Sequence, residues 1–112
     1  MECGIQIEAE PPGKRLQHMS LLSGGERALT AIALLFAMIK INPSPVCLLD
    51  EIDAPLDDAN LVRFGTYLRG LKGSQFLIIT HRKPTMALCD ALYGVAMEEK
   101  GVSKLVSVKI NQ

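Results

Sequence analysis

The sequence predicts an α/β fold with a mostly parallel sheet, flanking helices and an antiparallel hairpin at the edge. Two short apolar runs, 46–49 and 75–80, lack the alternation of half-exposed strands, which is typical of parallel strands covered on both faces. A helical pattern lies between these runs, as a crossover between parallel strands requires. The last segment predicts two strands, 92–97 and 103–108, around a turn at 99–101.

The composition is that of one small domain. The chain has 112 residues, of which 48% are hydrophobic and 21% are charged, so it can bury a core. Its 12 basic and 12 acidic side chains cancel, which excludes a dedicated basic arm for nucleic acid. Cys3, Cys47 and Cys89 have no CxxC spacing, which argues for a reducing cytosol and against a disulfide or zinc framework. The longest apolar run, 31–39, is shorter than the roughly 20 residues of a membrane helix, so we expect a soluble cytoplasmic protein.

The first elements are a strand, two loops and a long helix. Residues 4–10 alternate apolar and polar side chains, which predicts a half-buried strand, and the prolines and glycine of 11–15 end it. Residues 19–25 form a second, glycine-rich loop. From 26 to 41 the chain predicts a helix that is apolar on almost every side, and such a helix is expected to be buried. The prolines in 42–45 stop this helix.

The second half of the chain alternates strands with helices. An acidic segment, 57–60, starts a helix, because apolar side chains then recur at helical spacing. Pro84 suits the first turn of another helix, which ends near residue 90. The four strands expected around these helices are 46–49, 75–80, 92–97 and 103–108.

The first candidate site is the segment 22–26, Leu-Ser-Gly-Gly-Glu, which opens the long helix. Glycines let other groups approach the backbone, and a helix N-terminus offers unpaired N–H donors and partial positive charge, so this arrangement can bind phosphate. Ser23 and Glu26 also have the spacing of a capping box, which stabilises any helix start. From the residues alone, both interpretations stay open.

The second candidate is a pair of carboxylates, Asp50 and Glu51, at the end of the apolar run 46–49. Ligands of α/β sheets bind at the carboxyl ends of the strands. One carboxylate can hold Mg²⁺ and the other can take a proton from an attacking water. The alternative is an acidic strand end that caps the following turn, and Asp57 in turn suits the N-cap of the next helix.

The third candidate is His81, which directly follows the strand predicted at 75–80. If the two buried strands are parallel neighbours, His81 lies at the same edge as Asp50 and Glu51. A histidine there can contact a terminal phosphate or hold a water, although a lone histidine in a loop is more often simply solvated. His18 has no such context, and we expect no role for it.

In combination these motifs resemble the C-terminal half of an ABC-type ATPase, with signature motif, Walker B with catalytic glutamate, D-loop and switch histidine. More narrowly, the chain looks like the C-terminal lobe of the head of a bacterial chromosome-segregation SMC protein. The segments that carry this resemblance are 22–26, 49–60, 79–83 and 92–97. Similar bacterial proteins often have Asn at the position of Arg82, which adjoins His81.

The resemblance implies an ABC-type P-loop NTPase head, of which residues 1–112 are a single C-terminal lobe. It implies ATP and Mg²⁺ as cofactors, sandwiched between two heads. Ser23, Gly24 and Gly25 would face the γ-phosphate bound by the other head. The remaining implied roles are support of Mg²⁺ by Asp50, polarisation of the attacking water by Glu51, a contact across the dimer interface by Asp57 and a contact to the γ-phosphate by His81.

The family also implies partners: the N-terminal lobe of the same head, a second SMC head, a kleisin subunit and DNA held by the full complex. It implies a location in the cytoplasm, at the nucleoid, and no association with a membrane. A P-loop needs Gly-x-x-x-x-Gly-Lys-Ser/Thr. The chain's Gly13–Lys14 has Glu8 at the required glycine and Arg15 after it, so it is no P-loop. We therefore expect a head fragment that starts at an introduced Met1 and is inactive alone.

Three other interpretations stay open. The first is the head lobe of an SMC-like DNA-repair ATPase, which shares the signature and Walker B motifs. The second is an ABC transporter subunit, in which Gln usually replaces Glu26 and no Ala-Pro precedes the D-loop. The third is a non-catalytic, partner-binding module with no nucleotide role. The absence of a P-loop is consistent with this interpretation. Adding an N-terminal lobe discriminates, because only an ATPase fragment gains activity from it.

Overall fold

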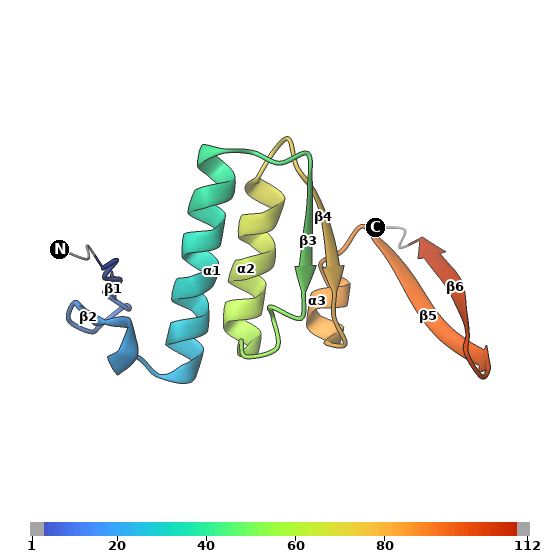
Figure 1. Ribbon diagram of the computed structural model, residues 1–112, viewed down its shortest axis with the longest axis horizontal. Helices are drawn as coiled ribbons and strands as arrows, with labels where there is room; N and C mark the ends of the chain where they lie inside the picture. The colour runs from blue at the N-terminus through green and yellow to red at the C-terminus, as the bar shows by residue number, and fades with distance from the viewer. Residues whose placement is uncertain (1–3, 110–112) are drawn as a thin grey trace.

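The computed structural model describes residues 4–109, which form an elongated molecule (Figure 1). A small N-terminal strand pair comes first, followed by two long helices side by side, a parallel strand pair with a short helix, and a C-terminal hairpin. Cys47 and Cys89 are free thiols, and burial raises the pKa of the Cys89 thiol, whereas Cys3 lies outside the described residues. No helix within residues 4–109 is long and apolar enough to span a bilayer.

The core lies between the two long helices and the first parallel strand. These elements are α1 (Gly24–Ile41), α2 (Asp58–Gly70) and β3 (Val46–Asp50). The buried side chains of the core are Ile32, Phe36, Leu49, Leu56, Leu61, Phe64 and Leu68. Phe36 of α1 stacks on Phe64 of α2 with ring centroids 5.7 Å apart, so the two helices are in direct contact.

Helix α1 begins at Gly24, two residues before the predicted start, because Ser23 caps it. Ile32 and Phe36 are buried, whereas Leu34, Met38 and Ile41 are exposed. The expectation of a helix buried on every side is therefore wrong for this chain. Helix α2 and β3 lie on one side of α1 and only the small N-terminal strand pair lies on the other, so part of its apolar surface stays exposed (Figure 1).

The parallel pair joins β3 to β4 (Gln75–Ile79) in a register that runs from Val46 opposite Gln75 to Asp50 opposite Ile79. Both strands alternate in burial. Their inner side chains pack against the core, but Leu48 is 64% exposed and Leu77 is 49% exposed on the outer face. The prediction that the two strands are parallel neighbours is confirmed. The prediction that both faces of the pair are covered is wrong for this chain, because the helices lie on one side alone.

Within residues 4–109 the strands form three separate two-stranded sheets. β5 (Ala91–Glu99) and β6 (Val102–Lys109) are the predicted antiparallel hairpin, and Gly101 at its turn has a φ of +80°, which favours glycine. The hairpin makes a sheet of its own and projects from one end of the molecule (Figure 1). The α/β class with parallel and antiparallel pairs and flanking helices is confirmed.

The remaining elements are shorter than the sequence predicts. β1 (Glu8–Ala9) pairs with β2 (Gln17–His18), so only two residues of the predicted 4–10 strand are regular. A 3₁₀ turn, η1 (Met19–Leu21), stands where a loop was expected. α3 (Lys83–Ala87) has Pro84 in its first turn, as predicted, but ends before residue 90.

Candidate functional site

The carboxyl ends of β3 and β4 bring Glu51 and His81 together. The Glu51 N–H donates to the Ile79 carbonyl at 2.9 Å, which extends the parallel pairing one residue past β3. Glu51 Oε1 then lies 3.6 Å from His81 Nδ1, and both side chains are exposed. The sequence placed these two residues at one strand edge on the condition that the strands are parallel neighbours, and that placement is confirmed.

Glu51 has an unusual backbone conformation. Its φ of +48° makes it the one non-glycine residue with positive φ among residues 4–109. Residues other than glycine, asparagine and aspartate rarely adopt this backbone region, and a residue held there is destabilised by about 1 kcal/mol or more. The Ala54 N–H donates to the Glu51 carbonyl at 3.2 Å, so the chain turns sharply directly after β3. This turn leaves the Glu51 carboxylate at the open edge.

Asp50 is the last residue of β3 and is exposed. Within residues 4–109 no hydrogen bond or ion pair engages its carboxylate, and no three His, Cys, Asp or Glu side chains gather as a metal site. Mg²⁺ is commonly bound through only one or two carboxylates together with substrate phosphates and waters. A single hard oxygen donor such as Asp50 fits that coordination, provided that other ligands complete it.

Ser23 caps α1 in a complete capping box. Its Oγ accepts from the Glu26 N–H at 3.3 Å, and the Glu26 carboxylate accepts from the Ser23 N–H at 3.0 Å. A hydrogen bond from Lys14, together with the Ser23 N–H, lowers the pKa of Glu26 below its ordinary value. The carboxylate is therefore ionised in the cap near neutral pH. The capping interpretation is confirmed, and it leaves the phosphate-binding one undecided.

The two glycines after Ser23 keep the start of α1 open. Nothing lies within 4 Å of the place where a Cβ would stand on Gly24, and on Gly25 that Cβ would meet only the Pro55 carbonyl, at 3.9 Å. The N–H groups of a first helical turn have no partners inside the helix. The start of α1 thus lies beside the segment that follows β3, at the end of the molecule to which β3 and β4 point (Figure 1).

Asp57 is the N-cap of α2, as the sequence allowed. Its Oδ1 accepts from the Asn60 N–H at 2.7 Å and its Oδ2 accepts from the Asn60 side-chain amide at 3.3 Å. The residue is exposed, so its carboxylate is also accessible from outside.

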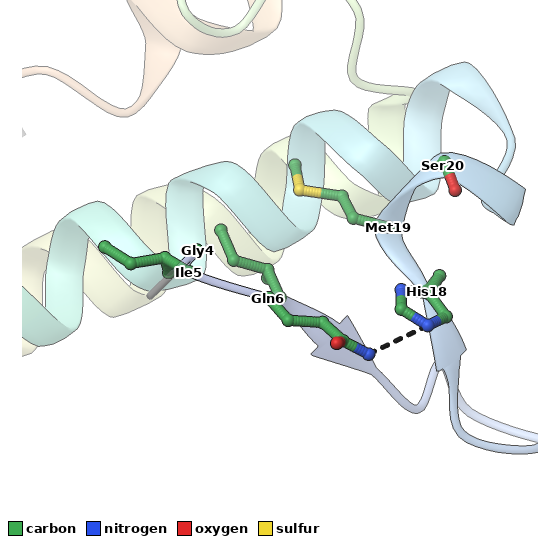
Figure 2. A pocket seen from close by; sticks show the side chains of 7 residues that line it. Gly4, Ile5, Gln6, His18, Met19 and Ser20 are labelled. Carbon is green, nitrogen blue, oxygen red and sulfur yellow. Dashed lines mark hydrogen bonds between the residues drawn. The ribbon is translucent and has the colours of Figure 1, made fainter. Parts of the chain in front are cut away.

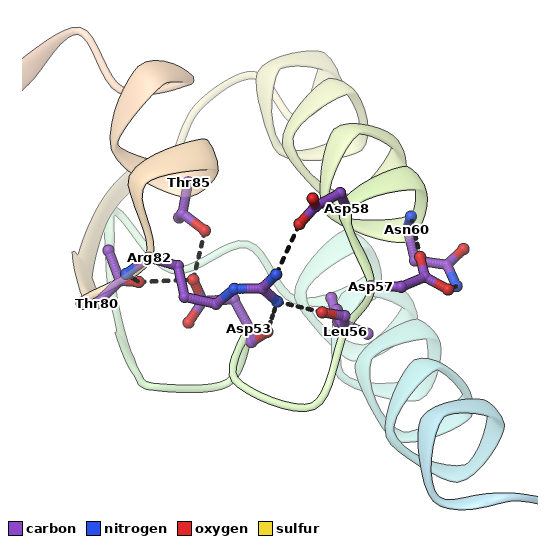
Figure 3. Close-up of polar contacts among 8 residues, drawn as sticks. All are labelled: Asp53, Leu56, Asp57, Asp58, Asn60, Thr80, Arg82 and Thr85. Carbon is purple, nitrogen blue, oxygen red and sulfur yellow. Dashed lines mark hydrogen bonds and ion pairs between the residues drawn. The ribbon is translucent and has the colours of Figure 1, made fainter.

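Sequence reasoning missed a buried polar network beside this edge (Figure 3). The Asp53 side chain is 1% exposed, and its carboxylate accepts from the hydroxyls of Thr80, at 2.6 Å, and of Thr85. Arg82 donates to the carbonyls of Asp53 and Leu56 and to the Asp58 carboxylate. No local signal separates Asp53 from its acidic neighbours, because its partners lie far along the chain.

His18 lies away from this edge, in a shallow hollow between the N-terminal segment and β2 (Figure 2). Its Nε2 is 2.8 Å from the Gln6 side-chain nitrogen and 3.8 Å from a Glu8 carboxylate oxygen. The side chain is half-exposed, and the lining residues include Ile5 and Met19. The hollow is lined by neither Glu51 nor His81, so it is separate from the pair at the strand edge.

A protein-family model described as "RecF/RecN/SMC N terminal domain" matches residues 5–104. The chain belongs to this family. Within the RecF/RecN/SMC family, the chromosome partition protein Smc of Halothermothrix orenii is 60% identical over 100% of this chain, and that of Bacillus subtilis is 57% identical over 100%. An uncharacterized protein of Rhodospirillum rubrum is 59% identical, and the match covers 66% of it. The chain spans about a tenth of the length of the two Smc relatives.

Solved structures agree with the family assignment. The SMC head domain from Thermotoga maritima is 50% identical, with a TM-score of 0.76 over 92% of this chain and 39% of that one. An SMC head bound to the C-winged helix domain of ScpA is 48% identical, with a TM-score of 0.84 over 92% and 32%. A chain from work on ATP-driven dimerization of SMC ATPases is 47% identical, with a TM-score of 0.88 over 96% and 67%. This member of the family therefore has the fold of part of an SMC head.

Proposed function

We propose that residues 1–112 are the C-terminal lobe of the ATP-binding and hydrolysing head of a chromosome-partition SMC protein. The observation that carries the proposal is the parallel register of β3 and β4, which holds Glu51 3.6 Å from His81 at an exposed strand edge. Identities of 57% and 60% to chromosome partition proteins favour this function over an SMC-like DNA-repair ATPase, the second candidate.

Glu51 is proposed as the catalytic base. Its carboxylate is exposed, so a water bound at the strand edge has direct access to it. Taking the proton from that water as it attacks the γ-phosphate makes the water a better nucleophile. Glu51 has positive φ at this turn, and its side chain is exposed rather than packed in the core. His81, on the neighbouring strand end, is proposed to contact the γ-phosphate and thereby fix the distance between phosphate and base.

Asp50 is proposed to support Mg²⁺, directly or through a water. It offers an exposed carboxylate one residue before Glu51, and the ligand set it lacks would come from ATP phosphates and the other lobe. Bound Mg²⁺ neutralises charge on the phosphates. Asp50 would hold the ion at the carboxyl end of β3, one residue before Glu51.

Ser23, Gly24 and Gly25 are proposed to face the γ-phosphate held by a second head. The open N-terminus of α1 supports this assignment, because free N–H groups and the helix dipole favour an anion there. Asp57 is proposed to act across the same interface, and its exposed carboxylate is fixed by the α2 cap. Capping and phosphate binding are compatible, since the cap uses the Ser23 oxygen as acceptor and leaves its hydroxyl proton free.

The proposed partners follow from what this chain lacks. No P-loop occurs in residues 1–112, so ATP requires an N-terminal lobe that carries one, and the isolated chain is expected to be inactive. The exposed outer face of β3 and β4 is a suitable surface for that lobe. A second head, a kleisin subunit and DNA complete the proposed assembly in the cytoplasm at the nucleoid.

The test is Glu51→Gln in a head assembled from this chain and an N-terminal lobe. The amide keeps the shape but cannot accept the proton, so ATP hydrolysis should slow by about 10²-fold or more while the ATP-bound dimer persists. The matched control is Glu98→Gln, an exposed glutamate of the hairpin that pairs with Lys104 and should leave turnover unchanged. Unchanged turnover in Glu51→Gln would remove Glu51 from the role of base.

A further inference from the structure

Arg82 joins the segment 53–58 to the end of β4 (Figure 3). One guanidinium nitrogen donates to the Asp53 carbonyl at 3.1 Å and also to the Leu56 carbonyl. The other terminal nitrogen donates to the Asp58 carboxylate at 2.8 Å. The Arg82 side chain is 22% exposed against 79% for Asp58, so the carbonyl contacts are the shielded ones.

A second set of hydrogen bonds closes the same connection from inside. The buried Asp53 carboxylate accepts from the hydroxyls of Thr80 and Thr85. Thr80 Oγ1 in turn accepts from the Arg82 N–H at 3.0 Å. A buried carboxylate is tolerated only where donors satisfy it, and these two hydroxyls do so. Two kinds of contact therefore join the segment 53–58 to the end of β4. The Asp53 carboxylate binds the Thr80 hydroxyl, and the Arg82 guanidinium binds backbone carbonyls of the segment.

The two parts of the chain that Arg82 connects lie next to the candidate site residues in the sequence. Glu51 lies just before the segment and Asp57 lies within it, whereas His81 directly precedes Arg82. An arginine presents five donors in a rigid, planar fork, so one side chain can hold two carbonyls and a carboxylate at once. A lysine at this place has the charge but lacks the fork.

We infer that Arg82 is a positioning residue, which holds the segment 53–58 against the end of β4 so that Asp57 and His81 keep a fixed relative position. Its effect on catalysis rests on the proposed ATPase function, whereas its hold on the segment does not. The rival explanation is that Arg82 only adds stability to the fold, and the two differ in which part of the chain loosens when Arg82 is replaced.

The first measurement is amide hydrogen exchange on the 112-residue chain. The Leu56 N–H is bonded within the segment, to the Asp53 carbonyl, and the Ala54 N–H is bonded to the carbonyl of Glu51 just before it, so both amides report on opening of the segment. In Arg82→Ala their exchange should rise by about 10-fold or more, while the Glu51 amide, bonded across to Ile79, should not change. Arg82→Lys should resemble Arg82→Ala, because the lysine cannot bridge the carbonyls.

Arg69→Ala is the matched control. The Arg69 guanidinium also donates twice to a backbone carbonyl, that of Leu88, at 3.3 and 2.9 Å, but outside the segment. Asp58→Asn is a second control, because it removes the exposed ion pair and keeps the carbonyl contacts. Both controls should leave exchange at Ala54 and Leu56 slow. Equal exchange in Arg82→Ala and Arg69→Ala at these amides would overturn the inference.

The second measurement is steady-state hydrolysis by the assembled head. Loss of positioning should lower kcat by about 10-fold or more in Arg82→Ala and in Arg82→Lys, with KM for ATP little changed. Faster exchange with unchanged kcat would mean that Arg82 holds the segment but does not position catalytic groups, which would overturn its role as a positioning residue. If the head assembled with the original chain does not hydrolyse ATP, the proposed function is contradicted. The exchange result alone then decides whether Arg82 holds the segment.

Discussion

Ser23 combines a structural role with the proposed binding role, and suitable substitutions separate the two. Its Oγ and N–H are engaged with Glu26 in the capping box. Removing the cap in Ser23→Ala should lower the free energy of unfolding by about 1 kcal/mol, whereas Ser23→Asn keeps a side-chain oxygen for the cap and should lose less. Denaturant unfolding of the chain measures both effects.

The binding role predicts a different outcome for Ser23→Arg. A large cation at the open start of α1 should leave ATP binding to the N-terminal lobe intact and abolish ATP-dependent dimerisation of assembled heads. Light scattering after gel filtration with Mg-ATP measures the dimer, and Ser23→Asn serves as the variant that keeps the cap. If Ser23→Arg heads still dimerise with ATP, Ser23 is a helix cap and nothing more.

At the residue scale, local chemistry was predictable and distant chemistry was not. The spacing of Ser23 and Glu26 and the acid before α2 are local signals, and both caps are present. The Asp53 network depends on Thr80 and Thr85, which only the parallel crossover brings close. No pattern around Asp53 distinguishes it from Asp57, although one is buried and the other is exposed.

Gly65 of α2 lies directly against the side chain of Leu88, the C-cap of α3. A Cβ on Gly65 of α2 would overlap the Leu88 side chain, whose Cγ and Cβ would lie 3.1 and 3.3 Å from it. The overlap itself is with a terminal methyl group, and the tight Cγ and Cβ contacts mean that the Leu88 side chain as a whole would have to shift to admit the Cβ. This close contact is one of the places where α2 packs against the end of α3.

Gly65→Ala should therefore destabilise the chain, although alanine is the better helix former by about 1 kcal/mol. The expected loss is about 1–3 kcal/mol in the free energy of unfolding, measured with urea. Adding Leu88→Ala should recover part of it relative to Leu88→Ala alone. Gly70→Ala is the control, since a Cβ at that last residue of α2 meets nothing within 4 Å. A Gly65→Ala chain more stable than the original would contradict this packing.

At the element scale, periodicity predicted the existence of the main helices and strands but not what covers them. The all-apolar pattern of α1 and the unbroken apolar runs of β3 and β4 predicted burial on every side. In the structure each has one covered face and one open face. A sequence records how much apolar surface an element needs to bury, and not whether the covering residues belong to the same chain.

At the scale of the whole molecule, residues 4–109 present an apolar sheet face that none of their own helices covers. Val46, Leu48, Leu77 and Ile79 all lie exposed on the outer side of β3 and β4, opposite the helices. Exposed apolar patches of this kind mark interaction surfaces. The proposed N-terminal lobe would cover this face and bring a lysine-bearing phosphate loop to the edge where Glu51 and His81 meet.

The central claim is that this chain contributes half of an ATPase site and needs the other lobe to complete it. Steady-state Mg-ATP hydrolysis by the chain, by an N-terminal lobe and by their mixture tests it most directly. Backbone N–H groups of a P-loop supply most contacts to the β-phosphate, and Ser23 and its two glycines do not replace them. Slow hydrolysis in the mixture, with none by either chain alone, is the predicted result. Hydrolysis by the 112-residue chain alone, or an inactive mixture of two folded and associated chains, would contradict it.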